Sequence, residues 1–294
     1  MNSDDILKRS TIALSDLQGH DIDVLTIHKP KDFQAAQHLL KVISKLSPLI
    51  GNMLESSLVT FLNSIDDWKN LGSWVRQDPG FPDTIFLGSI DPKPGIEIKT
   101  WFPLATEITA RFKDSYALLE KGNTNVVVVA WLPEMILYGK PKIIDIWIDS
   151  AMSLAEARDK HYHNPPDYLV FEPEDTSSRT INLQQTNTNG YKFQGTRQQL
   201  KEAEKIVKKW GKLDPDTHSK EYQELLKTLL GKFTYRLDTN FAKIDRIEHK
   251  GLEDFKIKVL NTKIQGHTIL KWSRMLKIDD VEDSQNGILK IMAT

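Results

Sequence analysis

The fold is constrained most by residues 81–111, FPDTIFLGSIDPKPGIEIKTWFPLATEITAR, which place three charges at the edges of two apolar runs. The runs are Thr84–Leu87 and Ile96–Phe102, and each is typical of a β-strand. The segment between them, 88–95, contains two glycines and two prolines, so the chain must turn there. The sequence therefore predicts a β-hairpin.

The three charges belong to Asp83, Glu97 and Lys99. If the hairpin is centred near Ile90, position 83 faces position 97, and alternation along the strand puts Glu97 and Lys99 on one face. A buried carboxylate is unfavourable unless a partner or a metal compensates it. Two carboxylates beside one ammonium therefore predict a built site. The alternative is a surface ion-pair cluster, which would contribute little to stability.

The pattern of Pro82-Asp83, thirteen further residues and then Glu97-Ile98-Lys99 resembles the PD-(D/E)xK signature of restriction-endonuclease-like nucleases. The run GIEIKTWFPLATEITARF is also similar to the active-site strand and following helix of type II restriction enzymes. Tripeptides of the same form end at Lys69, Lys93, Lys250 and Lys256. Only the copy at 97–99 lies in a predicted strand, follows a Pro-Asp at a family-like distance and leads into a predicted helix.

The resemblance implies an α/β (α+β) fold with a restriction-endonuclease-like core, in which helices flank a mixed central sheet and accessory helical and β elements are added. It implies Mg²⁺-dependent hydrolysis of phosphodiester bonds in double-stranded DNA at a specific short sequence, leaving 5′-phosphate ends. Asp83, Glu97 and the carbonyl of Ile98 would hold the Mg²⁺, with no other small-molecule cofactor. Lys99 would orient the attacking water and stabilise the transition state.

Glu55 is a further candidate metal ligand. A helix expected at about Leu49–Ile65 has a broad apolar face, and Glu55 lies within that face. In many of the nucleases that the chain resembles, an acidic residue on this helix helps to hold the metal. The alternative is that Glu55 lies at the rim of the face and reaches water.

Other elements follow from periodicity and composition. Apolar residues at helical spacing predict helices from Lys31 to Pro48 and from Pro103 to Lys121. The unbroken apolar run Val126–Leu132 predicts a central strand buried on both faces, and Ile143–Asp149 predicts another strand. Further strands are expected at Phe233–Leu237, Asp254–Leu260, His267–Trp272 and Gly287–Met292. We expect one domain over 1–294, with a core at about 50–175, an N-terminal helical region at 1–49 and accessory, DNA-recognition and dimerisation elements at 176–294.

The segment 150–195 is poor in core residues and rich in bases and amides, which is the composition of a loop that reads DNA bases. The helix expected at 196–212 is amphipathic and basic, so it could contact phosphates or cover a dimer seam. The candidate DNA-binding residues are Arg111, Arg158, Lys160, Arg179, Asn182, Gln184, Gln185 and Lys192. Any of them could equally be an ordinary polar loop residue.

Composition limits the classes of function. The chain of 294 residues has no cysteine, which excludes disulfides and thiolate-ligated metal sites. No apolar run reaches the eighteen or so residues that span a bilayer, and the polar N-terminus does not resemble a secretory signal, so we expect a cytosolic protein with no membrane partner. A formal net charge of −1 argues against DNA binding, although a basic groove can be offset by acidic faces elsewhere.

The partners expected from the resemblance are double-stranded DNA and a second copy of the chain, because a twofold homodimer matches the symmetry of a palindromic site. Two alternatives remain open. One is a DNA-repair or mobile-element nuclease with the same core, and the other is a non-catalytic DNA-binding protein whose three charges form an inert cluster.

Overall fold

The computed structural model of the chain describes residues 1–23, 25–77, 80–112, 119, 123–161, 170–172, 190–194, 196–210, 220–233, 235–238, 242–276 and 281–293. The chain divides into two compact units. The first, here called the sheet unit, is made of Met1–Ala110, Glu120–Met152 and His249–Thr294. The second unit is made of Arg111–Leu119 and Ser153–Glu248. The expected core boundary near residue 175 does not coincide with the limits of either unit.

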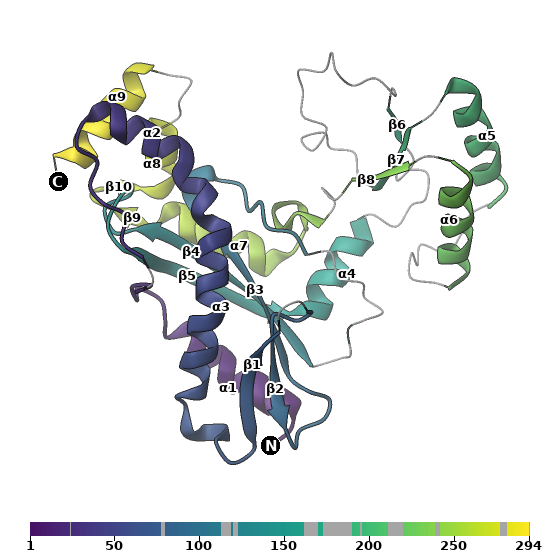
Figure 1. The fold of residues 1–294 in the computed structure, drawn as a ribbon, viewed down its shortest axis with the longest axis horizontal. Helices are drawn as coiled ribbons and strands as arrows, with labels where there is room; N and C mark the ends of the chain where they lie inside the picture. Colours follow the sequence, from purple (N-terminus) through teal and green to yellow (C-terminus); the bar gives the residue numbers. More distant parts are fainter. Residues whose placement is uncertain are drawn as a thin grey trace. The chain divides into compact units, whose positions relative to one another are not determined.

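The sheet unit is built on a five-stranded sheet in the order β1-β2-β3-β4-β5. The strands are β1 (Gly72–Arg76), β2 (Thr84–Gly88), β3 (Gly95–Trp101), β4 (Thr124–Pro133) and β5 (Pro141–Ser150). The pair β3–β4 is parallel and the other three pairs are antiparallel. The chain is therefore a mixed α/β protein whose mixed central sheet is flanked by helices, as the sequence predicts (Figure 1).

Strand β4 is the buried centre of this sheet. Every residue from Val126 to Leu132 is fully buried, and β3 and β5 pair with β4 on its two sides. Strands buried on both faces have continuous apolar sequences, so the prediction for this run is confirmed.

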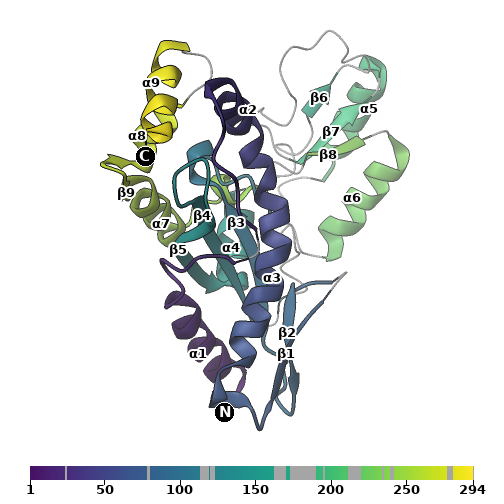
Figure 2. The ribbon, with the colours of Figure 1, turned by 60° about the vertical axis from the view of Figure 1, so that its left-hand side comes forward.

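One face of the sheet is covered by α3 (Ser47–Asn63), which buries Ile50, Leu54, Leu58 and Leu62 at helical spacing. The Thr100 hydroxyl on β3 donates a hydrogen bond of 3.2 Å to the Ser47 carbonyl of α3. Trp101, the next residue, points to the opposite face, where its ring packs on Phe255 of α7 (Lys250–Asn261) with centroids 5.9 Å apart. Figure 2 shows α3 and α7 on opposite sides of the sheet.

The remaining elements of the sheet unit are short or peripheral. They are α1 (Ser3–Ser15), α2 (Phe33–Ile43), α8 (Ile269–Met275), α9 (Val281–Met292), the 3-10 turns η1 (Ser44–Leu46), η2 (Asp66–Trp68) and η3 (Pro103–Ala105), and the hairpin β9 (Lys263–Ile264) and β10 (His267–Thr268). Among the described residues, none of the helices has the length and apolar character needed to cross a bilayer.

The second unit contains α4 (Ala151–His161), which begins in the sheet unit, and a three-stranded sheet in the order β6-β7-β8. Its strands are β6 (Val170–Glu172), β7 (Gly190–Gln194) and β8 (Tyr235–Asp238), and its other helical elements are α5 (Arg197–Lys208), α6 (Lys220–Lys232) and η8 (Ile244–Arg246). The predicted basic helix is confirmed as α5, which begins with a capping box between Thr196 and Gln199. Its apolar side packs on Leu229 and Phe233, and its lysines are exposed.

Several predicted elements are wrong. The helix expected from Pro103 is only the turn η3 over residues 103–105, because Thr106 takes a left-handed conformation with φ of 60°. Residues 106–112 then continue without a helix, and most of 113–121 lies outside the described residues. Ile108 and Phe112 are nevertheless fully buried.

Three of the four strands predicted in the C-terminal part are helical in the structure, so these predictions are wrong. Asp254–Leu260 lies in α7, Gly287–Met292 lies in α9, and His267–Trp272 is mostly α8 after the two-residue strand β10. Short apolar runs do not distinguish strand from helix, and the spacing of the buried residues Leu252, Phe255 and Val259 is helical. Only Phe233–Leu237 is close to a real strand, β8.

The hairpin β1–β2 depends on its aromatic core, which gives a testable prediction. Phe86 is fully buried and meets Trp74 edge-on at 5.6 Å, and Trp74 in turn meets Trp68 at 6.4 Å. We expect Phe86→Ala to lower the free energy of unfolding by about 3–5 kcal/mol, because it leaves a cavity against Trp74. Urea unfolding followed by tryptophan fluorescence measures the change.

The neighbouring Leu87 is the matched control, since its side chain points to the other face of β2 and is 39% exposed. Leu87→Ala should lower the free energy of unfolding by less than about 1 kcal/mol. Equal losses in the two variants would contradict the buried aromatic core.

Candidate active site

The candidate site lies where β2 and β3 separate. The two strands pair at Thr84↔Ile96 and Ile85↔Gly95, and the same register continued by one residue puts Asp83 opposite Glu97, as the sequence predicts. Beyond this point β3 continues to Trp101 without β2 beside it. The Ile98 N–H on this side of β3 donates a hydrogen bond of 2.6 Å to Oδ2 of Asp83 instead of to a strand.

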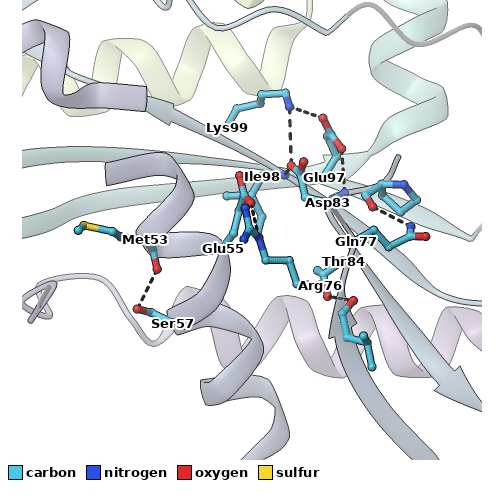
Figure 3. Close-up of polar contacts among 12 residues, drawn as sticks. Met53, Glu55, Ser57, Arg76, Gln77, Asp83, Thr84, Glu97, Ile98 and Lys99 are labelled. Atoms are coloured by element: carbon cyan, nitrogen blue, oxygen red, sulfur yellow. Dashed lines mark hydrogen bonds and ion pairs between the residues drawn. The ribbon is translucent and has the colours of Figure 1, made fainter. Parts of the chain in front are cut away.

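Asp83, Glu97 and Lys99 converge at this point (Figure 3). The main-chain N–H of Asp83 donates to Oε2 of Glu97 at 3.1 Å. The Lys99 ammonium is paired with Oε1 of Glu97 and lies 3.8 Å from Oδ2 of Asp83. The predicted convergence of the three charges is therefore present in the fold.

The burial of these side chains distinguishes the cluster from a surface ion pair. The side chains of Lys99 and Asp83 are 18% and 19% exposed, and that of Glu97 is 6% exposed. Opposite charges held this far from water interact more strongly than exposed pairs, but each group also loses most of its hydration. The site is thus largely enclosed by protein, while Asp83 and Lys99 keep a path to solvent.

Gln77, which follows β1, holds the main chain before β2 in place. Its N–H donates to the Asp83 carbonyl at 2.8 Å, and its side-chain amide donates to the Pro82 carbonyl at 2.9 Å. These bonds fix the direction in which the Asp83 side chain leaves the backbone. This role was not predicted from the sequence, because it depends on the pairing of β1 with β2.

Gly95 leaves the space in which this segment lies. A Cβ at this position would be 2.4 Å from Cγ of Pro82 and 3.2 Å from Oγ1 of Thr124. Pro82 can therefore pack directly on the backbone of β3 only because residue 95 has no side chain. Sequence reasoning assigned Gly95 to the turn and missed this contact.

Glu55 has a partner different from the one expected. Its carboxylate on α3 accepts a hydrogen bond of 2.9 Å from Nε of Arg76 on β1, as Figure 3 shows. The Glu55 side chain is 14% exposed, so it does not simply extend into water at the rim. Within the part of the chain that the structure describes, no group of three or more histidines, cysteines, aspartates or glutamates is arranged to hold a metal ion. The metal role of Glu55 therefore gains no support. Its pairing with Arg76 was not predicted from the sequence.

A divalent cation at the candidate site would bind to two carboxylate side chains and one main-chain carbonyl. Asp83 and Glu97 supply carboxylate oxygens, and the carbonyl of Ile98 points to the same side of β3 as its N–H, toward Asp83. Mg²⁺ prefers oxygen ligands and commonly binds through one or two carboxylates while keeping several waters. The donor set fits that ion.

The candidate DNA-binding residues are not brought together by the described structure. Arg158 lies in α4 and not in a loop, and it is 2% exposed, with its guanidinium donating to the Phe112 carbonyl at 2.9 Å. This burial gives no support to a surface DNA contact at Arg158, because the group lies against the protein. Arg111 forms an isolated β-bridge with Lys243 in the second unit.

The other candidates are only partly described. Lys160 lies in α4 and Lys192 lies in β7, where the backbone alone is described. Arg179, Asn182, Gln184 and Gln185 lie outside the described residues.

Comparison with known proteins finds no matching family model, no similar curated protein and no similar solved structure.

The contact between Gly95 and Pro82 gives a prediction. Gly95→Ala should displace Pro82 and with it Asp83, because a methyl group 2.4 Å from Cγ of Pro82 cannot be accommodated without movement. We expect the free energy of unfolding to fall by about 1–3 kcal/mol. In an NMR spectrum the amide signals of Asp83 and Ile98 should shift, because the hydrogen bonds at both groups change.

Gly231→Ala is the control, because a Cβ at this position in α6 meets no atom within 4 Å. That variant should be as stable as the parent protein or slightly more stable, by up to about 1 kcal/mol. An unchanged Asp83 amide signal in Gly95→Ala would show that the Pro82 contact does not position the carboxylate.

Proposed function

We propose that this chain is a Mg²⁺-dependent nuclease of the PD-(D/E)xK type that hydrolyses phosphodiester bonds in double-stranded DNA. More narrowly, we propose a type II restriction endonuclease that acts as a homodimer at a specific short sequence and leaves 5′-phosphate ends. The convergence of Asp83, Glu97 and Lys99 where β2 leaves β3 is the observation that carries the proposal.

The order of the elements also supports it. A helix, three antiparallel strands and then a strand parallel to the third follow one another as α3, β1, β2, β3 and β4. This agrees with the αβββαβ order implied by the resemblance, except that the crossover from β3 to β4 has no α-helix among its described residues. A restriction-endonuclease-like core is the narrower fold that we propose from this order.

In the proposed reaction, Asp83, Glu97 and the Ile98 carbonyl would hold Mg²⁺. When bound, the ion would polarise the phosphate, lower the pKa of a bound water and stabilise the leaving oxygen. Hydrolysis forms a bond from the water oxygen to phosphorus and breaks the bond to the 3′ oxygen, which leaves as a hydroxyl. The two carboxylates are held for this purpose by main-chain N–H groups at Asp83 and Ile98.

Lys99 has a role of its own in this scheme. Its ammonium is an N–H donor that is paired with Glu97 and lies 3.8 Å from the Asp83 carboxylate. From this place it can orient the attacking water and stabilise the negative charge that develops around phosphorus. Without a metal, the same ammonium partly neutralises Glu97 and Asp83, which is the arrangement of the inert cluster in the non-catalytic alternative.

A cleavage assay with the purified protein, plasmid DNA and Mg²⁺ distinguishes the proposal from its alternatives. Discrete fragments with defined ends are expected for a restriction enzyme. Untargeted nicking, or cuts at mismatches or unusual DNA structures, would instead support the repair or mobile-element nuclease. Binding of DNA without cleavage under varied divalent metals would support the non-catalytic DNA-binding protein.

Lys99→Ala gives the decisive prediction for the site. We expect cleavage to fall by about 10²–10³-fold or more, because charge stabilisation at the reacting phosphate is lost. DNA affinity should stay within about threefold of that of the parent protein, since one partly buried ammonium contributes little to overall phosphate binding. Gel assays of cleavage and a fluorescence-anisotropy titration measure the two quantities.

Lys93→Ala is the matched control. Lys93 ends another tripeptide of the same form, Asp91-Pro92-Lys93, but it is exposed in the turn between β2 and β3. This variant should cleave as fast as the parent protein. Full cleavage activity of Lys99→Ala would refute the assignment of the active site to Asp83, Glu97 and Lys99.

A further inference from the structure

We propose that the cationic face of α5, in the second unit, is a binding surface for the phosphates of double-stranded DNA. The cationic face is defined by five exposed side chains: Arg197, Lys201, Lys205, Lys208 and Lys209. Because the DNA is the substrate of the proposed nuclease, this role rests on the proposed function. Phosphate contacts carry no base sequence, so the surface would hold any duplex.

The two sides of α5 have different surroundings. The apolar side is used within the second unit, where Ala203 forms a buried cluster with Leu229 of α6 and with Phe233. The two helices lie side by side in Figures 1 and 2. Successive residues of an α-helix are rotated by about 100°, so Lys201 and Lys205 lie opposite the apolar side. The packing of α5 on α6 therefore turns these lysines to solvent.

Charge is distributed unevenly along the chain and around this helix. The whole chain has 39 basic and 40 acidic residues, whereas residues 197–209 have five basic and two acidic ones. By the same rotation, Glu202 and Glu204 lie at the two borders between the cationic face and the apolar side. The middle of the cationic face thus contains only positive charge.

The cations of this face are not consumed by ion pairs. Within the described part of the chain, no carboxylate pairs with any of the five, although two glutamates lie on the same helix. Lysines on other helices do form such pairs four residues apart, as Lys8 does with Asp4 and Lys250 with Asp254. The positive charge of α5 therefore remains available to an anionic partner.

Helix stability explains only part of the cationic face. Cations are favourable in the last turn of a helix, which suits Lys205 and Lys208. Arg197 lies in the first turn, where a positive charge is unfavourable, and Lys201 lies near the middle. The face extends along the whole helix, so the helix dipole does not account for it.

Burial and charge favour DNA over other partners. A helix that binds a membrane surface inserts its apolar side, but the apolar side of α5 is buried against α6. Two copies of the chain meeting through this face would bring like charges together. The row from Arg197 to Lys208 is about 16 Å long, and DNA carries one negative charge per about 1.7 Å of its axis. The face therefore matches several phosphates.

The test is the salt dependence of DNA binding, measured by fluorescence anisotropy with a labelled duplex of arbitrary sequence in EDTA, so that no Mg²⁺-dependent cleavage occurs. The double variant Lys201→Gln/Lys205→Gln should weaken binding by about tenfold or more at low salt. The slope of log K against log salt should become shallower by about 1.8, because each lost phosphate contact contributes about 0.9. Glutamine has nearly the helix propensity of lysine, and thermal unfolding checks that the variant is folded.

Two controls separate the position of the charge from its amount. The variant Lys201→Arg/Lys205→Arg should keep the slope of the parent protein, because both charges remain. Lys227→Gln removes an exposed lysine from α6, outside the cationic face, and should also keep the slope. An unchanged slope in the double glutamine variant would refute the inference. An equal loss per lysine in Lys227→Gln would refute it too, since it would show a general effect of net charge.

Glu204→Gln should have the opposite effect. It removes a negative charge from the border of the cationic face, so DNA affinity at low salt should rise by about two- to threefold. If the lysines only stabilised the helix, this variant would bind DNA as the parent protein does. If the face instead covered a dimer seam, the double glutamine variant would change the molecular mass in sedimentation and keep the slope. Either result would overturn the assignment.

Failure of the proposed function gives a different result. If the parent protein binds DNA but never cuts it, the nuclease proposal fails and the slopes still decide the role of α5. If the parent protein cuts DNA and the double glutamine variant has an unchanged slope, only the role of α5 fails. If the parent protein does not bind DNA, both fail.

Discussion

The hydrogen bond from the Ile98 N–H to the Asp83 carboxylate is the interaction on which the candidate site depends. A strand N–H left without a partner in a buried position is unfavourable by about 1–3 kcal/mol, and β2 is not present beyond Thr84 to supply one. The carboxylate takes the place of the missing strand. The bond that completes β3 is thus also the bond that holds Asp83 opposite Glu97, so the stability of the sheet and the geometry of the charges have one cause.

Local patterns in the sequence were enough to predict the centre of the fold. The turn-rich segment between two apolar runs predicted the hairpin β2–β3, and the position of its turn predicted that Asp83 faces Glu97. The run of valines predicted the buried strand β4, and helical spacing predicted α3. Each of these features follows from residues close together in the chain, where side-chain alternation and turn chemistry act directly.

The parts that the sequence did not predict depend on distant contacts. The partner of Glu55 follows from how α3 packs on β1, and the role of Gln77 follows from how β1 pairs with β2. The helices α7 and α9 were predicted as strands because short apolar runs fit both periods until their neighbours are known. The expected helix after Pro103 ends within one turn, at the left-handed Thr106.

The close packing of Pro82 on Gly95 has a consequence for the turn between β2 and β3. A change of one residue in a hairpin loop ordinarily shifts the register and turns every side chain to the other face. In this hairpin the alignment of β2 with β3 is also fixed away from the turn, because the Pro82 ring fits only against a residue without a side chain, Gly95. The exposed turn residues Asp91 and Lys93 are therefore positions at which a fluorophore could be attached while the charged end of the hairpin keeps its alignment, whereas the backbones of Ser89 and Pro92 are hydrogen-bonded to Leu71 and Ser3.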